Sequence, residues 1–294
     1  MSKPIIAVTG AHGQVGNEIK VLSAQYPAFD FLFVDKDDMP IDDAEGVHRW
    51  FEQHKPAFCL NCAAYTAVDK AETDKEVAML VNGEAPGILA AACTAFNTRF
   101  IHISTDYVFD GLATKPYLES DATSPVNYYG ATKLRGEERV FAHHPNAIIL
   151  RTSWVYSEFG HNFVKTMMRL MKEKESLSVV NDQQGSPTYA RDLAQVMLAI
   201  AAGAQKNPAT WVPGIYNYSN EGIISWHAFA QAIKELIGSA CTVNGIPTSG
   251  YPTPAKRPAY SAFNKEKIKA TYSVAIPAWR DSLKACIERL QRQG

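Results

Sequence analysis

The octapeptide TGAHGQVG, residues 9–16, ends the first apolar run of the chain, PIIAVTG (4–10), and leads into the helix-like segment QVGNEIKVLSAQ (14–25). Three glycines, Gly10, Gly13 and Gly16, lie in this turn. Glycines permit a tight turn and let backbone N–H groups approach a pyrophosphate at a helix N-terminus. The spacing is GxxGxxG, so the loop is longer than in the simplest GxGxxG folds. Its place after a first strand predicts a dinucleotide-binding loop.

The chain continues as an alternation of apolar runs and helix-like segments. The further runs are FDFLFVD (29–35), AFCLNCAA (57–64), RFIHISTD (99–106) and NAIILRTSWVY (146–156). The segments between them are DDAEGVHRWFEQH (42–54), EVAMLVNGEAPGILAAACTAF (76–96) and ATKLRGEERVFAHH (131–144). Continuous apolar strands interleaved with helices indicate a parallel sheet covered on both faces. The fold class expected is therefore α/β, with a doubly wound, Rossmann-type domain over residues 1–160.

The second half, residues 161–294, predicts a smaller mixed α/β lobe that supplies a substrate pocket. A helix is expected in NFVKTMMRLMKEKE (162–175), with a core-facing stripe of methionines. Two more helices are expected in YARDLAQVMLAIAAGA (189–204) and SWHAFAQAIKELIG (225–238), with a short strand in GIYNYS (214–219) between them. The boundary at residue 160 is approximate, and the chain can cross between the lobes.

Composition narrows the class of protein. The 294 residues are 46% apolar and 20% charged with a net charge of −1, which favours a soluble globular protein and neither nucleic acid nor a membrane surface as partner. The N-terminus MSKPIIAVTG has no signal-peptide layout, and no uninterrupted apolar stretch approaches bilayer-spanning length, so a cytoplasmic location is expected. Cys59 and Cys62 form a CxxC inside an apolar run, which is more typical of two buried thiols than of a metal or redox motif.

Asp35 ends the second apolar run, nineteen residues after Gly16. A carboxylate at this point can accept hydrogen bonds from the ribose hydroxyls of adenosine, and it repels a 2′-phosphate. Lys36 follows and softens that repulsion. The alternative is that Asp35 merely ends the strand. The sequence thus favours NADH as cofactor, with NADPH also accepted.

The stretch NYYGATK, residues 127–133, places Tyr129 and Lys133 one helical turn apart. An ammonium beside a phenol lowers the pKa of the phenol and makes proton exchange practicable. Tyr129 then supplies the proton that a carbonyl oxygen needs after hydride transfer, while Lys133 holds the nicotinamide ribose. Thr105, at the end of the fourth apolar run, offers a hydroxyl to the same substrate oxygen.

Several motifs together resemble the extended short-chain dehydrogenase/reductase superfamily and, within it, the dTDP-4-dehydrorhamnose reductase family. They are TGAHGQVG, NCAAYTAVDKAE, STDYVFDG, YYGATKLRGE, LRTSWVY, NDQQGSPT and RPAYS. The resemblance implies hydride transfer from NADH or NADPH to the C4 keto group of dTDP-4-dehydro-L-rhamnose, a nucleotide sugar. It also implies that Thr105, Tyr129 and Lys133 are catalytic. The cofactor would be held by Gly13, Gln14 and Val15 at its phosphates and by Ala63, Ala64 and Tyr65 at its nicotinamide side.

Four residues are candidates for substrate binding. Asp106 is followed by Tyr107, whereas the resemblance implies an Asp–Glu pair at this place in dehydratases, so reduction fits better than dehydration. Trp154 is implied to lie against the deoxysugar, with a core tryptophan as the alternative. Asn162 can bond a pyrophosphate or sugar oxygen or cap a helix. Arg257 suits bidentate phosphate contact or is a solvated loop charge.

Other outcomes stay open at this point. Glu18 matches a position at which some relatives hold magnesium between two subunits, but Asp192 and Gln195 stand where another glutamate would be sought. No metal site is therefore predicted, and a homodimer, with or without magnesium, is an open alternative. A reductase or epimerase of another nucleotide sugar is a second reading. A non-catalytic subunit that resembles the regulatory subunit of methionine adenosyltransferase is a third.

Overall fold

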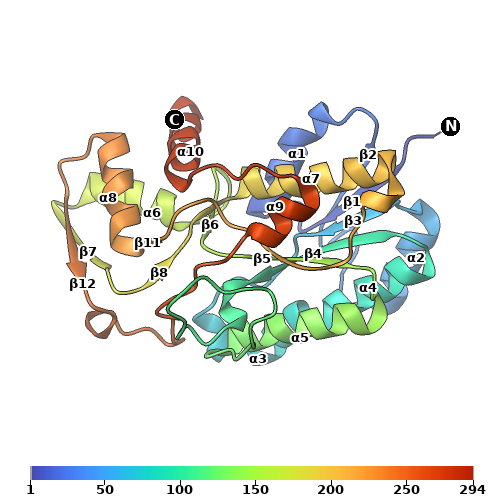
Figure 1. Ribbon diagram of the computed structural model, residues 1–294, viewed down its shortest axis with the longest axis horizontal. Helices are drawn as coiled ribbons and strands as arrows, with labels where there is room; N and C mark the ends of the chain where they lie inside the picture. Colours follow the sequence, from blue (N-terminus) through green and yellow to red (C-terminus); the bar gives the residue numbers. More distant parts are fainter. Residues whose placement is uncertain (1, 294) are drawn as a thin grey trace.

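A computed structural model describes residues 2–293 of the chain and shows two lobes of unequal size (Figure 1). The larger lobe is built on a six-stranded sheet of order β10-β5-β4-β3-β1-β2, in which all neighbouring strands are parallel. Its strands are β1 (Ile5–Thr9), β2 (Asp30–Val34), β3 (Phe58–Asn61), β4 (Arg99–Thr105), β5 (Ile148–Thr152) and β10 (Gly214–Asn217). The first five coincide with the apolar runs of the sequence.

Helices cover both faces of this sheet (Figure 1). One face carries α1 (Gln14–Leu22) and α7 (Ala190–Lys206), and the other carries α2 (Ala44–His54), α4 (Ala85–Ala95) and α5 (Tyr128–His143). Side chains alternate along each strand, so Phe58 packs toward the first group of helices and its neighbour Cys59 toward the second. The predicted doubly wound α/β class is confirmed.

One helical run, Lys75–Ala95, is long and apolar enough by length and composition to cross a membrane. It consists of α3 (Lys75–Met79), the π-helical turn η3 (Leu80–Glu84) and α4. In the fold this run packs against α2 and α5, and just over half of its apolar window is buried inside the protein. Its apolar composition is that of a helix in the core of the larger lobe.

The smaller lobe lies at the left of Figure 1. It contains α6 (Phe163–Glu173), α8 (Trp226–Ile237) and α10 (Trp279–Gln293), and the parallel pair β7 (Ser176–Val180) and β12 (Thr242–Ile246). Met167 and Met171 of α6 are buried in the core of this lobe, as the methionine stripe predicts.

The short elements of the whole chain are β6 (Val155–Tyr156), β8 (Gln184–Gly185), β9 (Thr188–Tyr189), β11 (Ile224–Ser225), α9 (Glu266–Tyr272), η1 (Ser23–Gln25), η2 (Lys70–Glu72), η4 (Asp106–Val108), η5 (Pro208–Thr210) and η6 (Thr248–Gly250).

The chain recrosses between the lobes after residue 160. Helix α7 packs on α1, and β10 extends the central sheet beside β5. Residues 190–217 therefore belong to the larger lobe, although a single cut at residue 160 assigns them to the smaller one. The reason is that a strand such as β10 completes its hydrogen bonds only on an existing sheet edge, and that edge is provided by β5.

The strand order reverses beside β1, whose two neighbours are β2 and β3. Ligands of open α/β sheets bind outside the carboxyl ends of the strands at such a reversal. The turns that follow β1 and β3 meet there, because a Cβ added to Gly10 would lie 2.6 Å from the Ala63 nitrogen. The fold thus puts two predicted cofactor segments at one crevice.

Candidate active site

The glycine-rich turn leaves the start of α1 open. Gly10 has φ +66°, and a Cβ on Gly16 would collide with the Gly10 carbonyl oxygen, so both positions require glycine. Gly13 is the N-cap of α1, where no side chain caps the helix and no acidic residue lies in the first turn. The first N–H groups of α1 and the positive end of its dipole are therefore free to face an anion.

A cavity of about 860 Å³ extends from this turn over the ends of β1, β2 and β3. Five predicted cofactor residues line it: Gly10, Gly13, Asp35, Ala63 and Ala64. Gly16 shapes the turn, whereas Val15 is buried in the core behind it. Gln14 reaches toward the smaller lobe, where its amide accepts a hydrogen bond from Asn162 at 3.0 Å. The crevice, the open helix start and the cavity fit a dinucleotide.

Asp35 lies just past the end of β2 and lines this cavity. Its carboxylate accepts the Asp37 N–H at 2.8 Å and contacts His12 Nε2 at 2.7 Å. The Asp37 N–H, and next the His12 ring, hold the pKa of Asp35 below its ordinary value. The side chain is therefore a charged acceptor inside the crevice, with Lys36 also on the cavity wall.

The turn after β3 is held by a buried polar network. Asn61 Oδ1 accepts the Ala63 N–H at 3.1 Å and the Thr9 hydroxyl at 2.7 Å. The Asn61 amide nitrogen lies 2.9 Å from His102 Nδ1. Burial, and then the charge of Lys133, lower the pKa of His102, so this histidine is neutral and belongs to the core.

Asn82 is a site residue that sequence reasoning missed. It lies in the π-helical turn η3, where its side chain accepts the Tyr65 N–H at 2.9 Å and donates to the Tyr65 carbonyl at 2.9 Å. It also donates to the Thr132 hydroxyl at 3.2 Å, on the catalytic helix. π-turns within α-helices often mark functional sites. The available signal was an asparagine inside an otherwise apolar helix.

The structure brings the three predicted catalytic residues together. Thr105 ends β4, and Tyr129 and Lys133 lie on successive turns of α5. All three are buried, with exposed fractions of 5%, 9% and 2% respectively. The Lys133 ammonium donates to the Ile103 carbonyl at 2.7 Å, which fixes its position beside β4. A phenol, a hydroxyl and an ammonium thus share one site at the carboxyl edge of the sheet.

The predicted lowering of the Tyr129 pKa by Lys133 is wrong. Burial raises the pKa of Tyr129 to about 12, and a hydrogen bond with Thr105 only partly opposes this. Burial also lowers the pKa of Lys133 to about 8, because its charged form is desolvated. Tyr129 therefore holds its proton at neutral pH, which suits a proton donor.

Helix α5 is anchored to the sheet by a buried ion pair. Arg151 of β5 makes two bonds to Glu137, from Nε to Oε1 at 2.9 Å and from Nη2 to Oε2 at 2.7 Å. Ser104 of β4 donates to the same carboxylate. Because this contact is one turn along from Lys133, it fixes the part of the helix that carries Tyr129 and Lys133.

Asp106 and Trp154 follow the ends of β4 and β5, which pair at Thr105 and Thr152. Asp106 is buried beside Thr105, whose hydroxyl donates to it at 3.0 Å, and burial raises its pKa to about 6. Trp154 is half-buried, has φ +48° and stacks on Trp226 with ring centroids 3.6 Å apart. Gly185 lies against the Trp154 indole, where any side chain would collide. The partner Trp226 is a second residue that sequence reasoning missed, because no motif of the chain singles it out.

The structure distinguishes between the alternatives for Asn162 and Arg257. Asn162 caps α6, because its Oδ1 accepts the Lys165 N–H at 3.1 Å, and its amide nitrogen also donates to the Ser157 carbonyl at 2.7 Å. The helix-cap alternative is therefore correct. Arg257 is no solvated charge: its side chain is 20% exposed and pairs with Asp69 at 2.7 Å.

The residues around Glu18 do not fit a resident magnesium ion. Glu18 Oε1 accepts from Ser157 at 2.7 Å and its Oε2 lies 3.3 Å from the Arg191 guanidinium, so protein groups already contact both of its oxygens. Asp192 is turned to Asn220 and Ser282. Within residues 2–293, no group of three or more His, Cys, Asp or Glu side chains is arranged to hold a metal. Burial, and then the neighbouring Glu158, raise the pKa of Glu18 to about 8.

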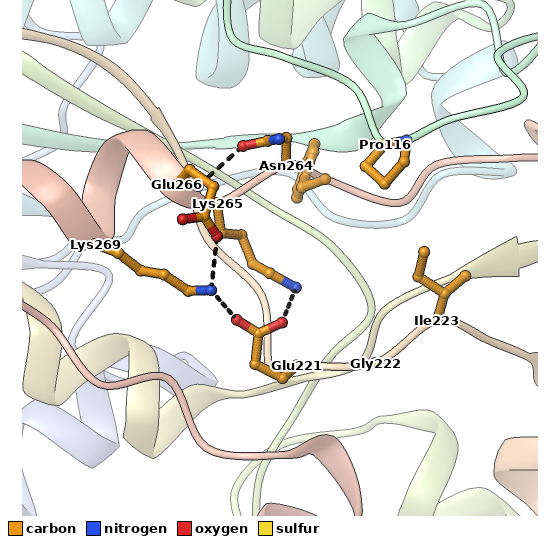
Figure 2. A pocket seen from close by; sticks show the side chains of 9 residues that line it. Pro116, Glu221, Gly222, Ile223, Asn264, Lys265, Glu266 and Lys269 are labelled. Atoms are coloured by element: carbon orange, nitrogen blue, oxygen red, sulfur yellow. Dashed lines mark hydrogen bonds and ion pairs between the residues drawn. The ribbon is translucent and has the colours of Figure 1, made fainter.

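A second hollow of about 460 Å³ lies beside α9 (Figure 2). Figure 2 shows Glu221 between two lysines, with Lys265 at 3.1 Å and Lys269 at 2.6 Å. Lys269 also pairs with Glu266 at 3.0 Å. The lysines of this hollow are thus neutralised by protein carboxylates, and the hollow lacks the convergent unpaired groups of the cofactor crevice.

Comparison with known proteins agrees with this geometry. A dTDP-4-dehydrorhamnose reductase of Burkholderia thailandensis is 41% identical over 302 residues, covering 98% of this chain and 99% of the relative. The crystal structure of a dTDP-4-dehydrorhamnose reductase from Clostridium acetobutylicum has a TM-score of 0.92 at 39% identity, covering 98% of this chain and 99% of the other. The enzyme of the same name from Bacillus anthracis, solved in complex with NADP, has a TM-score of 0.91 at 35% identity, covering 98% and 100%.

The family described as "RmlD substrate binding domain" matches residues 4–292, which include both lobes and every residue of the candidate site. Matches of this extent and identity establish membership rather than fold alone. The chain belongs to the RmlD substrate binding domain family.

Proposed function

We propose that this protein reduces the C4 keto group of dTDP-4-dehydro-L-rhamnose to dTDP-L-rhamnose, with NADPH or NADH as hydride donor. The observation that carries the proposal is the buried set of Thr105, Tyr129 and Lys133 beside β4, the strand that pairs with β3, whose following turn lines the dinucleotide crevice. The full-length relatives named dTDP-4-dehydrorhamnose reductase support the choice of sugar, and the relative solved with NADP supports the cofactor.

The crevice would hold the cofactor through residues of three strand ends. The open start of α1 at Gly13 receives the pyrophosphate, and Asp35 accepts from the adenosine ribose. Ala63 and Ala64, fixed by Asn61, lie on the nicotinamide side. When bound there, the reduced nicotinamide supplies the hydride to the substrate carbonyl carbon.

Tyr129 completes the reduction by protonating the substrate oxygen. Hydride addition turns the carbonyl oxygen into an alkoxide, which takes the phenolic proton. Burial keeps Tyr129 protonated at neutral pH, since its pKa is raised to about 12. Thr105 bonds the same oxygen and orients it. Lys133, held by the Ile103 carbonyl, would bind the nicotinamide ribose. Asp106 stands alone after Thr105, without the second carboxylate expected of a dehydratase, so the site favours reduction.

Turnover of dTDP-4-dehydro-L-rhamnose tests this proposal. Oxidation of NADPH and of NADH is followed by loss of nicotinamide absorbance, and the product is identified by NMR. Tyr129→Phe is expected to lower kcat by about 10²- to 10⁴-fold, the usual contribution of a positioned proton donor. Tyr128→Phe is the matched control, because the neighbouring ring faces Lys75 at 5.3 Å and is expected to leave kcat unchanged. No turnover by the wild type with either cofactor would refute the reaction, and full activity of Tyr129→Phe would refute the proton donor.

A further inference from the structure

We propose that Asp69 and Asn127 are positioning residues, which hold segment 255–257 against the catalytic helix so that Arg257 faces the diphosphate of the nucleotide-sugar substrate. The inference rests on the proposed function, because it deepens the substrate site of that reaction. The contacts that carry it join residues far apart in the chain and do not belong to the cofactor crevice.

Asp69 uses both of its carboxylate oxygens on this segment. Oδ1 accepts the Ala255 N–H at 3.2 Å, and Oδ2 accepts Arg257 Nη2 at 2.7 Å. Asp69 directly precedes η2 in the loop that follows the nicotinamide-side residues 63–65. One carboxylate therefore fixes both the backbone and the side chain of a loop that is 186 to 188 residues away in sequence.

Asn127 ties the same segment to α5. Its Oδ1 caps the helix by accepting the Gly130 N–H at 2.8 Å, and its Nδ2 donates to the Lys256 carbonyl at 2.8 Å. Glu72 adds a third link, since it accepts the Tyr128 N–H at 2.8 Å. The start of the catalytic helix, the loop of Asp69 and segment 255–257 thus meet at one junction.

Arg257 retains binding capacity at this junction. Its Nη1 is buried and has no hydrogen-bond partner within the described part of the chain, although its Nη2 is paired. Its charge acts on Tyr107, whose ring meets the Tyr129 ring edge-on with centroids 5.5 Å apart. A guanidinium nitrogen without a partner has hydrogen-bond donors that the protein does not use. A diphosphate suits it, because guanidinium groups bind phosphate oxygens through charge-assisted hydrogen bonds.

Asp69 and Asn127 would act before the substrate arrives. A long arginine side chain on a loop loses rotamer freedom when it binds an anion, and this loss weakens binding. Pairing with Asp69 and the anchored Lys256 carbonyl remove that freedom in advance. Loss of either contact is therefore expected to weaken substrate binding while the chemical step at Tyr129 continues.

The first test is Asp69→Asn, which keeps the size of the side chain but replaces one acceptor oxygen by a donor. We expect KM for dTDP-4-dehydro-L-rhamnose to rise about tenfold, the equivalent of about 1.4 kcal/mol, with kcat within about twofold of wild type. KM for NADPH should not change. Glu235→Gln is the matched control, because it makes the same change in the exposed pair with Arg280. An unchanged sugar KM, or an equal rise in the KM for NADPH, would overturn the proposal.

The second test is Asn127→Asp, which keeps the helix-capping oxygen but lacks the N–H that reaches Lys256. Asn127→Asp should raise the sugar KM, as Asp69→Asn does, and leave the melting temperature of the protein near that of wild type. Asn207→Asp repeats the change at the remote cap of η5, where the side chain accepts only the Ala209 N–H, and should alter neither value. A sugar KM for Asn127→Asp equal to that of Asn207→Asp would contradict the role of Asn127.

A double-mutant cycle shows whether Asp69 acts through Arg257. In an Arg257→Gln background, Asp69→Asn should raise the sugar KM by less than about twofold, because the side chain that it positions is already gone. An equally large rise in that background would overturn the proposed route.

Two measurements separate this proposal from the reaction itself. Hydrogen exchange of the Ala255 amide should accelerate in Asp69→Asn without any substrate, and the affinity for dTDP alone, measured by calorimetry, should fall about tenfold. If wild type fails to reduce the sugar but both changes occur, the reaction is wrong and the positioning stands. If wild type reduces the sugar and neither change occurs, the positioning is wrong.

Discussion

Helices α1 and α5 begin at the same carboxyl edge of the sheet, but only the first turn of α5 is capped by a side chain. The start of α1 at Gly13 has no side-chain cap. The start of α5 is capped by Asn127, whose Oδ1 accepts the Gly130 N–H at 2.8 Å. Each helix has a different role in the proposed active site, and the difference between their first turns fits those roles.

An uncapped helix start keeps N–H donors for a ligand, whereas a capped one uses them to hold the helix in place. The open end of α1 can stabilise an anion only because its donors are unpaired in the protein. Helix α5 carries Tyr129 and Lys133, whose reaction geometry depends on a fixed helix. It is accordingly held at both its cap and Glu137.

Removing the anchor of α5 should have the largest effect. Glu137→Gln leaves Arg151 buried without its charged partner, and breaking a buried pair in this way lowers the free energy of unfolding by about 3–5 kcal/mol. Urea unfolding measures the loss. Glu173→Gln removes the partner of Arg169 in an exposed pair and should change stability by less than about 1 kcal/mol. Equal losses in the two variants would contradict an anchoring role for Glu137.

Filling the turn before α1 should abolish most cofactor binding. A Cβ at Gly16 would meet the Gly10 carbonyl oxygen and lie 2.8 Å from Ala11 Cα, so Gly16→Ala must displace the loop. The Kd for NADPH, measured by fluorescence, should rise about 100-fold, or about 2.7 kcal/mol. Gly203→Ala in α7 meets nothing nearer than 3.5 Å and should bind NADPH as wild type does. Unchanged affinity in Gly16→Ala would show that the turn is not part of the site.

The buried acid of α1 should make stability depend on pH. Folded Glu18 keeps its proton up to about pH 8, whereas in the unfolded chain it loses the proton near its ordinary pKa of 4.5. Its contribution to stability is therefore full below pH 4.5 and is lost as the pH rises through about 8. Between pH 5 and pH 8, the free energy of unfolding of Glu18→Gln should fall by about 2 kcal/mol less than that of the wild type. The difference is no larger because Glu158 shares part of the titration. Parallel pH profiles of the two proteins would refute this assignment.

A side-chain cap on α1 should weaken NADPH binding without lowering the stability of the protein. Gly13→Asp places an acceptor at the N-cap, where φ −73° suits any residue, and the structure should be retained or gain about 0.5 kcal/mol. The added charge repels a pyrophosphate, so the Kd for NADPH should rise about tenfold. Gly13→Asn gives a neutral cap and should raise the Kd less. A Kd equal to that of wild type in Gly13→Asp would contradict the anion site.

Much of the site was predictable because its signals are local. Gly10, Gly13 and Gly16 fall within seven residues, and their spacing predicts a tight turn before a helix. Tyr129 and Lys133 lie one turn apart, so their proximity follows from helix geometry alone. The ends of parallel strands meet at one edge, and for this reason the strand pattern alone predicts that Thr105 and Asp35 lie near the crevice.

Other features depended on contacts that no local pattern encodes. The pairing of Arg257 with Asp69 joins positions 188 residues apart. The hydrogen bonds between Asn82 and Tyr65 depend on a π-helical turn, in a segment whose sequence predicts a regular α-helix. The return of β10 to the central sheet was hidden for the same reason, since its partner β5 lies in the first half of the chain.

The sequence by itself determined the α/β class, the glycine-rich turn and the proximity of Tyr129 and Lys133 on one helix, because periodicity and spacing act over a few residues. The tertiary structure decided their electrostatics and their partners. Burial raises the pKa of Tyr129 to about 12, although its helical spacing from Lys133 predicts a decrease, because removing water from a phenolate disfavours the charged form. Desolvation and long-range pairing depend on which distant segments come together, and only the folded chain settles that.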